Sequence, residues 1–495
     1  MIRATTGGVM KTYRSNLMNS FINMNSSRNT VLTQRTFNSF AENPAAAAKA
    51  FRLRKSRMMV ESQYEICTDS YKRYETAVAC LQSIDDILCT KDGVYGQYMT
   101  TLTGTTLSML NDPTGDARTQ LNKVLDQMSQ SIIQTMNQKY GDNFIFAGAD
   151  GHNVPFEIRN DKLYYRGVPV DAAIPNVLTN KDGDPLAVSA TGQVDPAAET
   201  YLNMDNVKTI TQEEYDKISK LVDVVDLTEY RKADIDPDDP VYDSLEDDVV
   251  YYKLNEPDEN GNDQYVSKDE YEAASAQLDS LLKDETGNLY EYTDENNEKC
   301  YIVFDEFQLM EKETYEQQKL DYEKLQYLAN EKYFVDIGYG FQEDPVTGKL
   351  IESSAFNASL NGINFIGWGL DEDGDPKNLY SLVQKMREIA TSVPEGGDWD
   401  SETYDEFYRL VQKFEDGVSS YQTEFVDLDA STGKLSNQQK LLEENFYNLQ
   451  EQYSDIEDVD MVEAITSFLW AEYCYNAALK VGNSILGQSL MDYLS

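Results

Sequence analysis

Residues 404–456 carry the pattern that decides the fold: YDEFYRLVQKFEDGVSSYQTEFVDLDASTGKLSNQQKLLEENFYNLQEQYSDI. Steps of alternately three and four residues meet an apolar side chain at nearly every position, and the exceptions are Thr432 and Gln439. The positions are Tyr404, Phe407, Val411, Phe414, Val418, Tyr421, Phe425, Leu428, Thr432, Leu435, Gln439, Leu442, Phe446, Leu449, Tyr453 and Ile456. A 3.5-residue repeat of this length predicts a long helix that packs on another helix in the manner of a coiled coil.

A second stripe of the same spacing lies near the other end of the chain. It runs through Ala46, Ala50, Leu53, Arg57, Val60, Tyr64, Cys67, Tyr71, Tyr74, Val78, Leu81, Asp85 and Leu88. Two stripes this apolar are not expected to face water, so we expect them to pack on each other as a long antiparallel helical rod built from both chain ends. The predicted rod core is Leu53, Val60, Tyr71, Val78, Leu81, Val411, Phe425, Leu442 and Phe446.

The residues between the two stripes have a different character. Turn sequences such as Asn260-Gly261 interrupt the chain, and short strands are expected, for example at 162–170. Thr211 and Ser267 each stand three residues before a glutamate, which is the capping-box pattern of a helix start. The predicted fold class is therefore mainly α, with an inserted α+β domain.

Amphipathic helices are expected at 9–32 and 460–494, beyond the ends of the rod. Asp460 is the expected N-cap of the second helix, with Glu463 three residues later. Neither helix has an apolar partner of matching length elsewhere in the chain, so we expect both to become ordered when neighbouring molecules cover them. The predicted assembly interface is Met10, Tyr13, Leu17, Phe21, Met24, Ile465, Phe468, Leu479, Leu486, Leu490 and Tyr493.

The charge is large and unevenly distributed. The formal net charge of −45 disfavours nucleic acid as a partner, because phosphate groups repel such a surface. Residues 1–60 hold ten Lys and Arg against one acid, Glu42, so this segment carries +9 and the rest of the chain −54. No uncharged apolar run reaches 18 residues and no apolar stretch opens the chain. We therefore expect neither a membrane span nor a Sec-type signal peptide.

The sequence offers little catalytic chemistry. His152 is the one histidine, and its Gly-His-Asn setting is typical of a turn. The five cysteines are odd in number and lack a C-x-x-C pair, which favours neither a disulfide framework nor a zinc site. Residues 371–375 (DEDGD) suggest calcium, but their glycine is fourth where an EF-hand loop needs it sixth, which favours a solvated turn. We therefore expect no enzyme activity, no catalytic residue, no cofactor and no metal.

Several motifs resemble those of the flagellar axial proteins. Residues 35–39 (RTFNS), followed by NPAAA at 43–47, are similar to the signature before that family's long helix. Residues 141–148 (GDNFIFAG) resemble its exit from the helical bundle into the outer domain. The ending at 485–494 (ILGQSLMDYL) is similar to that of the third hook-associated proteins, which join the hook to the filament, whereas flagellins usually end in small and amide residues.

The resemblance covers roughly residues 1–157 and 335–495, and residues 170–334 are a variable insertion beyond it. It implies a structural subunit of the bacterial flagellum, needed for motility, that forms the junction ring between hook and filament. Such subunits are exported unfolded by the flagellar type III apparatus without a cleaved signal peptide, and they act outside the cell. The implied partners are other copies in the ring, a hook-side hook-associated protein, flagellin on the filament side and a cytoplasmic export chaperone on the C-terminal helix.

Pattern and resemblance together divide the chain into five segments. They are an N-terminal assembly and export helix (1–40), the N-terminal half of the rod (41–150), an inserted outer α+β domain (151–375), the C-terminal half of the rod (376–458) and a C-terminal assembly helix (459–495). Two alternatives stay open. One is a flagellin-type filament subunit, and the other is an extracellular acidic binding or hydrolytic protein on a helical stalk.

Overall fold

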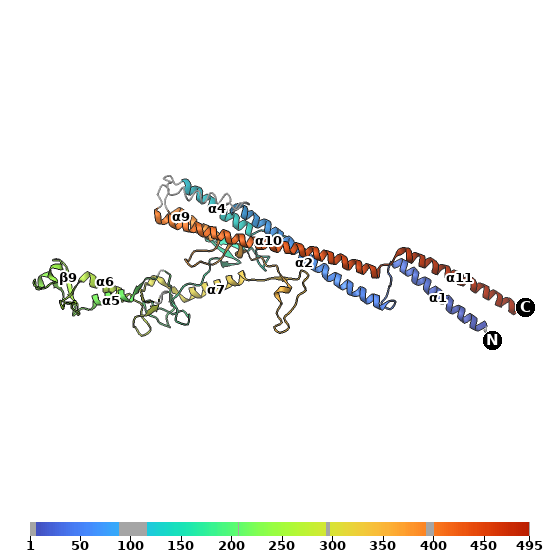
Figure 1. Cartoon of the computed structure of the whole chain (residues 1–495), viewed down its shortest axis with the longest axis horizontal. Coiled ribbons are helices and arrows are strands. Elements are labelled where there is room, and N and C mark those ends of the chain that lie inside the picture. The colour runs from blue at the N-terminus through green and yellow to red at the C-terminus, as the bar shows by residue number, and fades with distance from the viewer. Residues whose placement is uncertain (1–5, 89–115, 206, 294–297, 393–399, 495) are drawn as a thin grey trace. The chain divides into compact units, whose positions relative to one another are not determined.

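The computed structural model describes residues 6–88, 116–205, 207–293, 298–392 and 400–494. Side chains are described within these ranges except at 87, 116–118, 120–121 and 484–494. The chain is mainly helical, with small antiparallel sheets that lie mostly in its middle part, which agrees with the predicted fold class at this level (Figure 1). It forms two compact units.

The first unit combines both chain ends with a segment from the middle. It comprises Met1–Pro155, Glu331–Phe365 and Ile389–Ser495. Its long helices are α1 (Thr6–Thr33), α2 (Pro44–Leu88), α4 (Asp116–Met136), α10 (Ser401–Glu457) and α11 (Met461–Leu494). Two short hairpins complete it, β1 (Lys139–Tyr140) with β2 (Asn143–Phe144), and β14 (Phe334–Val335) with β15 (Phe356–Asn357), which follows the turn η4 (Glu352–Ser354).

Helices α2 and α10 run side by side in opposite directions (Figure 1). The Arg54 guanidinium meets Glu457 near the start of α2, whereas the Tyr421 hydroxyl donates to the Leu81 carbonyl, 2.5 Å away, near its end. The buried residues of α10 follow the predicted stripe closely. They include Phe407, Val411, Phe414, Val418, Tyr421, Leu428, Thr432, Leu435 and Leu442.

The buried stripe of α2 differs in part from the predicted spacing. Its members are Val60, Gln63, Cys67, Ser70, Tyr74, Ala77, Leu81, Ile84 and Leu88. Five of the predicted core residues are only half-buried, namely Leu53, Tyr71, Val78, Phe425 and Phe446. Tyr71 and Val78 each follow directly after a buried residue, Ser70 and Ala77. Small residues at a helix contact let the two backbones approach closely, so Ser70 and Ala77 occupy the contact and their bulkier neighbours flank it.

Helices α1 and α11 pack on each other, in the opposite sense along the chain. The Tyr13 hydroxyl donates to the Ala478 carbonyl, 3.1 Å away, and the Phe21 and Tyr475 rings lie 5.7 Å apart. The expectation that the terminal helices lack a partner within the chain is therefore wrong. The reason lies in the small residues Ala464, Ala471, Ala478 and Gly482 of α11, which are spaced by seven, seven and four residues along one face.

The second unit comprises Phe156–Asn330 and Ile366–Glu388. It begins with a three-stranded antiparallel sheet of β3 (Phe156–Arg159), β4 (Lys162–Tyr165) and β5 (Val168–Pro169). Two helices cross the boundary between the units, α8 (Gly362–Ile366) and α9 (Leu379–Ser392). Short 3₁₀ turns η1 (Lys232–Asp234), η2 (Tyr242–Ser244) and η3 (Glu306–Gln308) lie in its loops.

The rest of this unit contains three similar modules, each a strand pair with a helix on it. They are β6 (Thr200–Leu202) and β13 (Leu309–Glu311) with α7 (Lys312–Ala329), β12 (Lys299–Ile302) and β7 (Thr209–Thr211) with α5 (Gln212–Val222), and β9 (Val250–Lys253) and β10 (Tyr265–Ser267) with α6 (Lys268–Asp279). Strands β8 (Tyr230–Arg231) and β11 (Glu291–Thr293) extend the last two sheets. Each module has its strands antiparallel and its helix directly after one of them.

In each module, two tyrosine rings pack on each other between the helix and the strand pair. The fourth residue of every helix is a tyrosine whose ring packs on a tyrosine of the partner strand, at 4.7–5.1 Å between ring centroids. The pairs are Tyr215 with Tyr301, Tyr271 with Tyr252, and Tyr315 with Tyr201. Both predicted capping boxes, at Thr211 and Ser267, are confirmed and open two of these helices.

Candidate assembly surface on the terminal helices

Helix α11 is apolar around most of its circumference. Its 34 residues include only four charged ones, Glu463, Glu472, Lys480 and Asp492. Asp460 caps it, because its carboxylate accepts the backbone N–H groups of Val462 at 2.8 Å and Glu463 at 3.2 Å, which confirms the predicted N-cap. A helix that is apolar all round is normally buried against partners on more than one side.

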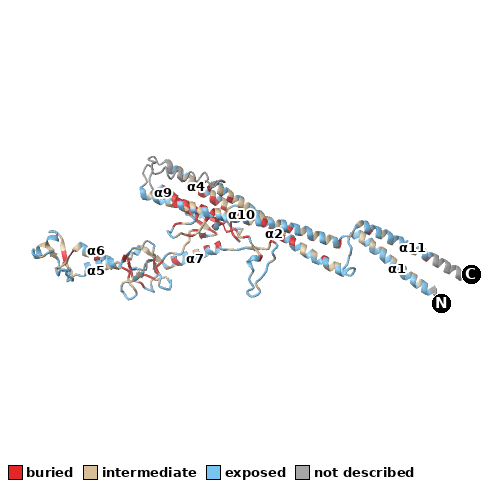
Figure 2. Ribbon diagram, viewed as in Figure 1, coloured by how far each residue is buried: buried red, intermediate tan, exposed pale blue. Residues whose placement is uncertain are grey.

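Pairing with α1 covers only one face of α11. Large apolar side chains remain exposed on both helices, and Trp470 and Tyr473 are 64% and 67% exposed. Exposed residues occupy much of α1 and of the described part of α11 (Figure 2). The exposed set on α11 is Val462, Ile465, Leu469, Trp470, Tyr473, Leu479 and Val481, and on α1 it is Val9, Met18, Phe21, Ile22 and Leu32. We call these twelve residues the terminal apolar surface. Exposed large apolar side chains in such number are typical of surfaces that contact another macromolecule.

The predicted assembly residues fall into three groups. The first group is half-buried and comprises Met10, Tyr13, Leu17, Met24 and Phe468. Tyr13 of this group makes the hydrogen bond between α1 and α11. Phe21, Ile465 and Leu479 are exposed and belong to the terminal apolar surface. Leu486, Leu490 and Tyr493 lie in the last turns of α11, and their side chains are outside the described part of the structure.

The sequence interpretation missed several strongly exposed members of this surface. Leu469, Trp470 and Tyr473 fall off the single stripe that it followed along residues 460–494. The signal was present in the composition of the segment, because a helix with so few charges offers apolar side chains in every direction. A single stripe was therefore too narrow a description of this helix.

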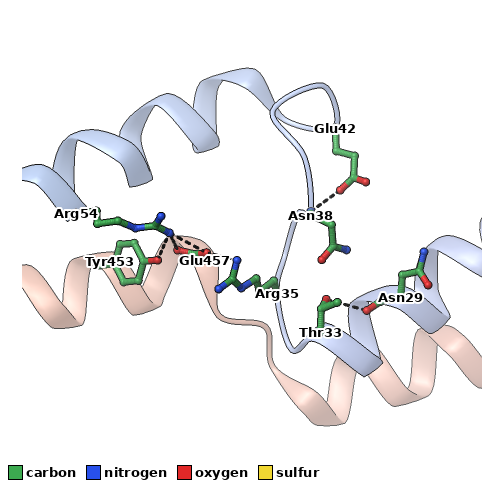
Figure 3. Close-up of polar contacts among 8 residues, drawn as sticks. All are labelled: Asn29, Thr33, Arg35, Asn38, Glu42, Arg54, Tyr453 and Glu457. Carbon is green, nitrogen blue, oxygen red and sulfur yellow. Dashed lines mark hydrogen bonds and ion pairs between the residues drawn. The ribbon is translucent and has the colours of Figure 1, made fainter.

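An ionic joint connects the two helix pairs of the first unit. Glu457 is the last residue of α10 and is 4% exposed. Its carboxylate accepts from the guanidinium groups of Arg54, at 3.1 Å, and Arg35, at 3.2 Å (Figure 3). Arg54 also donates to the Tyr453 hydroxyl at 2.6 Å, and the Thr36 N–H donates to the Glu457 carbonyl at 2.8 Å. One carboxylate thus ties together α2, α10 and the segment that leaves α1.

A pocket of about 480 Å³ lies beside this joint. It is lined by the apolar side chains of Phe37, Phe40, Ala47 and Phe51 and by arginines that include Arg52. Phe40 and Phe51 are 63% and 68% exposed. The pocket is therefore lined by apolar and cationic side chains together.

The histidine His152 and the buried cysteine Cys67 both lie in positions where they serve the structure of the chain. His152 is exposed in a turn in which its backbone N–H donates to the Asp150 carboxylate at 3.2 Å. Burial raises the pKa of the Cys67 thiol to about 11, which keeps it protonated at neutral pH. Its position against the Leu435 carbonyl makes it a packing residue of the α2–α10 contact.

One cluster of carboxylates has the proximity of metal ligands. Oxygens of Asp371, Asp373 and Asp375 lie within 4.8 Å of one another. Asp371 accepts the backbone N–H groups of Asp373 at 3.0 Å and Asp375 at 2.8 Å, and Lys385 pairs with Asp375 at 2.5 Å. The same turn geometry recurs around Asp258 and Asp284, so these carboxylates serve the turn.

No protein-family model matches the chain, and no curated protein matches it. Among solved structures, two crystal structures of FlgL from Xanthomonas campestris align with 81% of this chain and 99% of theirs. Their sequence identity to this chain is 12%, and their TM-scores are 0.31 and 0.29. No described helix combines the length and the apolar character needed to cross a membrane.

Proposed function

We propose that this chain is a structural subunit of the bacterial flagellum that forms the junction ring between hook and filament. The observation that carries the proposal is the terminal apolar surface, which is left uncovered although α1 and α11 already pair with each other. The resemblance of residues 35–47, 141–148 and 485–494 to the hook–filament junction proteins supports the choice of assembly.

The terminal helices supply the assembly energy in this proposal. Burying one leucine-sized side chain stabilises an interface by about 1.5–3 kcal/mol, and a ring repeats each contact between every pair of neighbours. Trp470 and Tyr473 suit the centre of such an interface, because aromatic anchors contribute most of the binding energy of protein contacts. The partners are other copies in the ring, a hook-side hook-associated protein and flagellin on the filament side.

The α2–α10 pair acts as the structural rod of the first unit. Its apolar seam has the 3.5-residue spacing of a coiled coil over most of α10. The role of the chain is mechanical, without catalysis or a cofactor. The three modules with paired tyrosines belong to the second unit, which corresponds to the inserted outer domain in this proposal.

The state of the chain before assembly follows from the same surface. A helix as apolar as α11 would aggregate in the cytoplasm, so a chaperone covers it until export. The chain then passes unfolded through the flagellar type III apparatus, led by an uncleaved N-terminal segment. Outside the cell it folds and joins the ring.

A deletion strain tests the proposal. Without this protein, hooks should form, flagellin should appear in the medium and filaments should be missing, because the adaptor that starts the filament is lost. Expression from a plasmid should restore filaments, except in a strain that lacks the flagellar export gate, where the protein should stay in the cell. Normal filaments after deletion would contradict the proposal, and secretion without the export gate would favour a stalked extracellular binding protein.

A further inference from the structure

The two ends of the chain carry opposite charge. Residues 7–57 contain nine Lys and Arg and one acid, Glu42. Residues 441–479 contain nine Asp and Glu and no Lys or Arg. These two segments supply the helices that pair within one molecule, α1 and the start of α2 with α11 and the end of α10. Neutralisation inside the molecule is therefore the first explanation to consider.

Few of these charged groups are neutralised by ion pairs inside the molecule. Glu457 forms ion pairs with Arg35 and Arg54, and the Asp460 carboxylate caps α11. Twelve exposed charged side chains of the two segments make neither an ion pair within 4.0 Å nor a side-chain hydrogen bond with the residues that the structure describes. Six are basic, Lys11, Arg14, Arg28, Lys49, Arg52 and Lys55, and six are acidic, Glu443, Glu444, Glu451, Asp455, Glu463 and Glu472. The helices meet through their apolar stripes, and these exposed charges take no part in that contact.

Exposed apolar side chains lie among both sets of charges. Met18, Ile22, Phe40, Phe51, Met58 and Met59 accompany the six basic groups, and we call these twelve residues the basic side. Leu441, Tyr447, Val462, Leu469, Trp470 and Tyr473 accompany the six acidic groups, and we call these twelve the acidic side. Charge alone would serve solubility, whereas charge mixed with exposed large apolar groups is the composition of a protein interface.

We infer that copies of this chain associate through a heterologous contact, in which the basic side of one copy docks on the acidic side of the next. A second copy is the occupant because its acidic side carries charges opposite in sign to those of the basic side, and both sides hold exposed large apolar side chains. The pocket beside Phe51 and Arg52 provides a concave place for an apolar side chain of the neighbour.

When two copies meet through different surfaces, one copy keeps a free basic side and the other keeps a free acidic side. Further copies can therefore add at both ends, and the contact repeats around a closed ring or along a helix. This inference deepens the proposed function, because it names the surfaces by which copies in the junction ring would meet. The net charge of −45 repels copies at long range. Salt at about 0.15 M screens that repulsion beyond about 8 Å, so the complementary charges at the contact decide the outcome.

Charge reversal on purified full-length protein tests the inference. One variant carries Lys49→Glu, Arg52→Glu and Lys55→Glu on the basic side, and a second carries Glu443→Lys, Glu444→Lys and Glu451→Lys on the acidic side. A control carries Glu61→Lys, Glu65→Lys and Asp69→Lys, which are exposed on α2 outside both sides. Sedimentation velocity over a range of concentrations at about 0.15 M salt measures association, and circular dichroism checks that each variant is folded.

The wild type and the control should form species larger than two copies as concentration rises. Each reversed variant alone should associate at least about 100-fold more weakly, because like charges then face each other. An equimolar mixture of the two reversed variants should recover association, since the acidic surfaces of one variant then meet the basic surfaces of the other. A wild type that stays monomeric or stops at two copies would overturn the inference, and so would a mixture that does not recover.

This test needs no flagella, so its result separates from that of the proposed function. Recovery in the mixture together with normal filaments in the deletion strain would leave the contact standing and remove the junction assignment. Missing filaments in the deletion strain together with unchanged association of both reversed variants would keep the junction assignment and remove the contact.

Discussion

The Glu457 carboxylate and the Arg54 guanidinium lie 3.1 Å apart although 403 residues separate them in the sequence. The side chain of Glu457 is 6% exposed, whereas that of Arg54 is 44% exposed. Arg35 is the second cation at the same carboxylate. Glu457 is therefore the group that needs this ion pair, because its carboxylate is shielded from water. Both arginines are partly exposed, so water can solvate either of them if the ion pair is broken.

Removing both arginines should cost more than the sum of the two single changes. Arg35→Ala and Arg54→Ala each leave Glu457 one partner, whereas the double variant leaves a buried carboxylate unpaired, which costs about 3–5 kcal/mol. Urea unfolding of the three variants, followed by circular dichroism, measures the difference. Adding Glu457→Gln to the double variant should recover much of the loss. Strict additivity of the single changes would argue against a shared carboxylate.

Gly482 should be essential to the pairing of the terminal helices. A Cβ atom at this position would lie 1.8 Å from the Tyr13 hydroxyl oxygen, so Gly482→Ala must displace the tyrosine ring from α11. We expect faster amide hydrogen exchange throughout α1. Gly433→Ala is the matched control, because nothing lies within 4 Å of its Cβ position, and it should stabilise α10 by up to about 1 kcal/mol.

A second change at Tyr13 makes the test of that contact sharper. Tyr13→Ala should restore slow exchange in α1 when it is combined with Gly482→Ala, since the clash disappears with the ring. Exchange that stays slow in Gly482→Ala alone would mean that the two helices do not pack as described.

Leu441 and Leu442 offer a neighbouring pair of sites with opposite burial. Leu442 is 3% exposed in the α2–α10 seam, and Leu441 is 54% exposed. Leu442→Ala should lower the free energy of unfolding by about 2–5 kcal/mol, whereas Leu441→Ala should change it by less than about 0.5 kcal/mol. Urea unfolding monitored on the helical signal compares them. Equal effects would contradict the assigned seam.

The α10 seam could be predicted from the sequence because bulky apolar residues occupy both of its alternating positions. Phe407, Phe414 and Tyr421 leave little choice of phase. The α2 seam was predicted correctly at only one of its two positions. Ser70 and Ala77 carry little apolar signal, so the bulkier Tyr71 and Val78 beside them were taken for the contact.

The pairing of α1 with α11 escaped prediction for a related physical reason. The contact uses Ala478 and Gly482, whereas the large apolar residues such as Trp470 face outward. An interpretation that equates large apolar residues with intramolecular core inverts the roles of the two faces. The three modules of the second unit also escaped prediction, because in two of them the paired strands lie far apart in the chain.

Assembly should depend on the outward face of α11 without any effect on the stability of the isolated protein. Trp470→Glu changes a side chain that is 64% exposed, so its unfolding should match the wild type within about 0.5 kcal/mol. Cells with this variant should secrete flagellin and lack filaments, as in the deletion strain. Lys440→Glu, an exposed change on α10, serves as the control and should leave filaments normal. Filaments in the Trp470→Glu strain would contradict the role of this face.

Immunogold electron microscopy tests the central claim most directly. An antibody raised against residues 207–293, which lie in the second unit, should reach its target on intact flagella. A junction subunit predicts a single band of gold where the hook meets the filament, and no label on a deletion strain. Gold along the whole filament would contradict the junction assignment and indicate a filament subunit, and label away from flagella would contradict a flagellar role altogether.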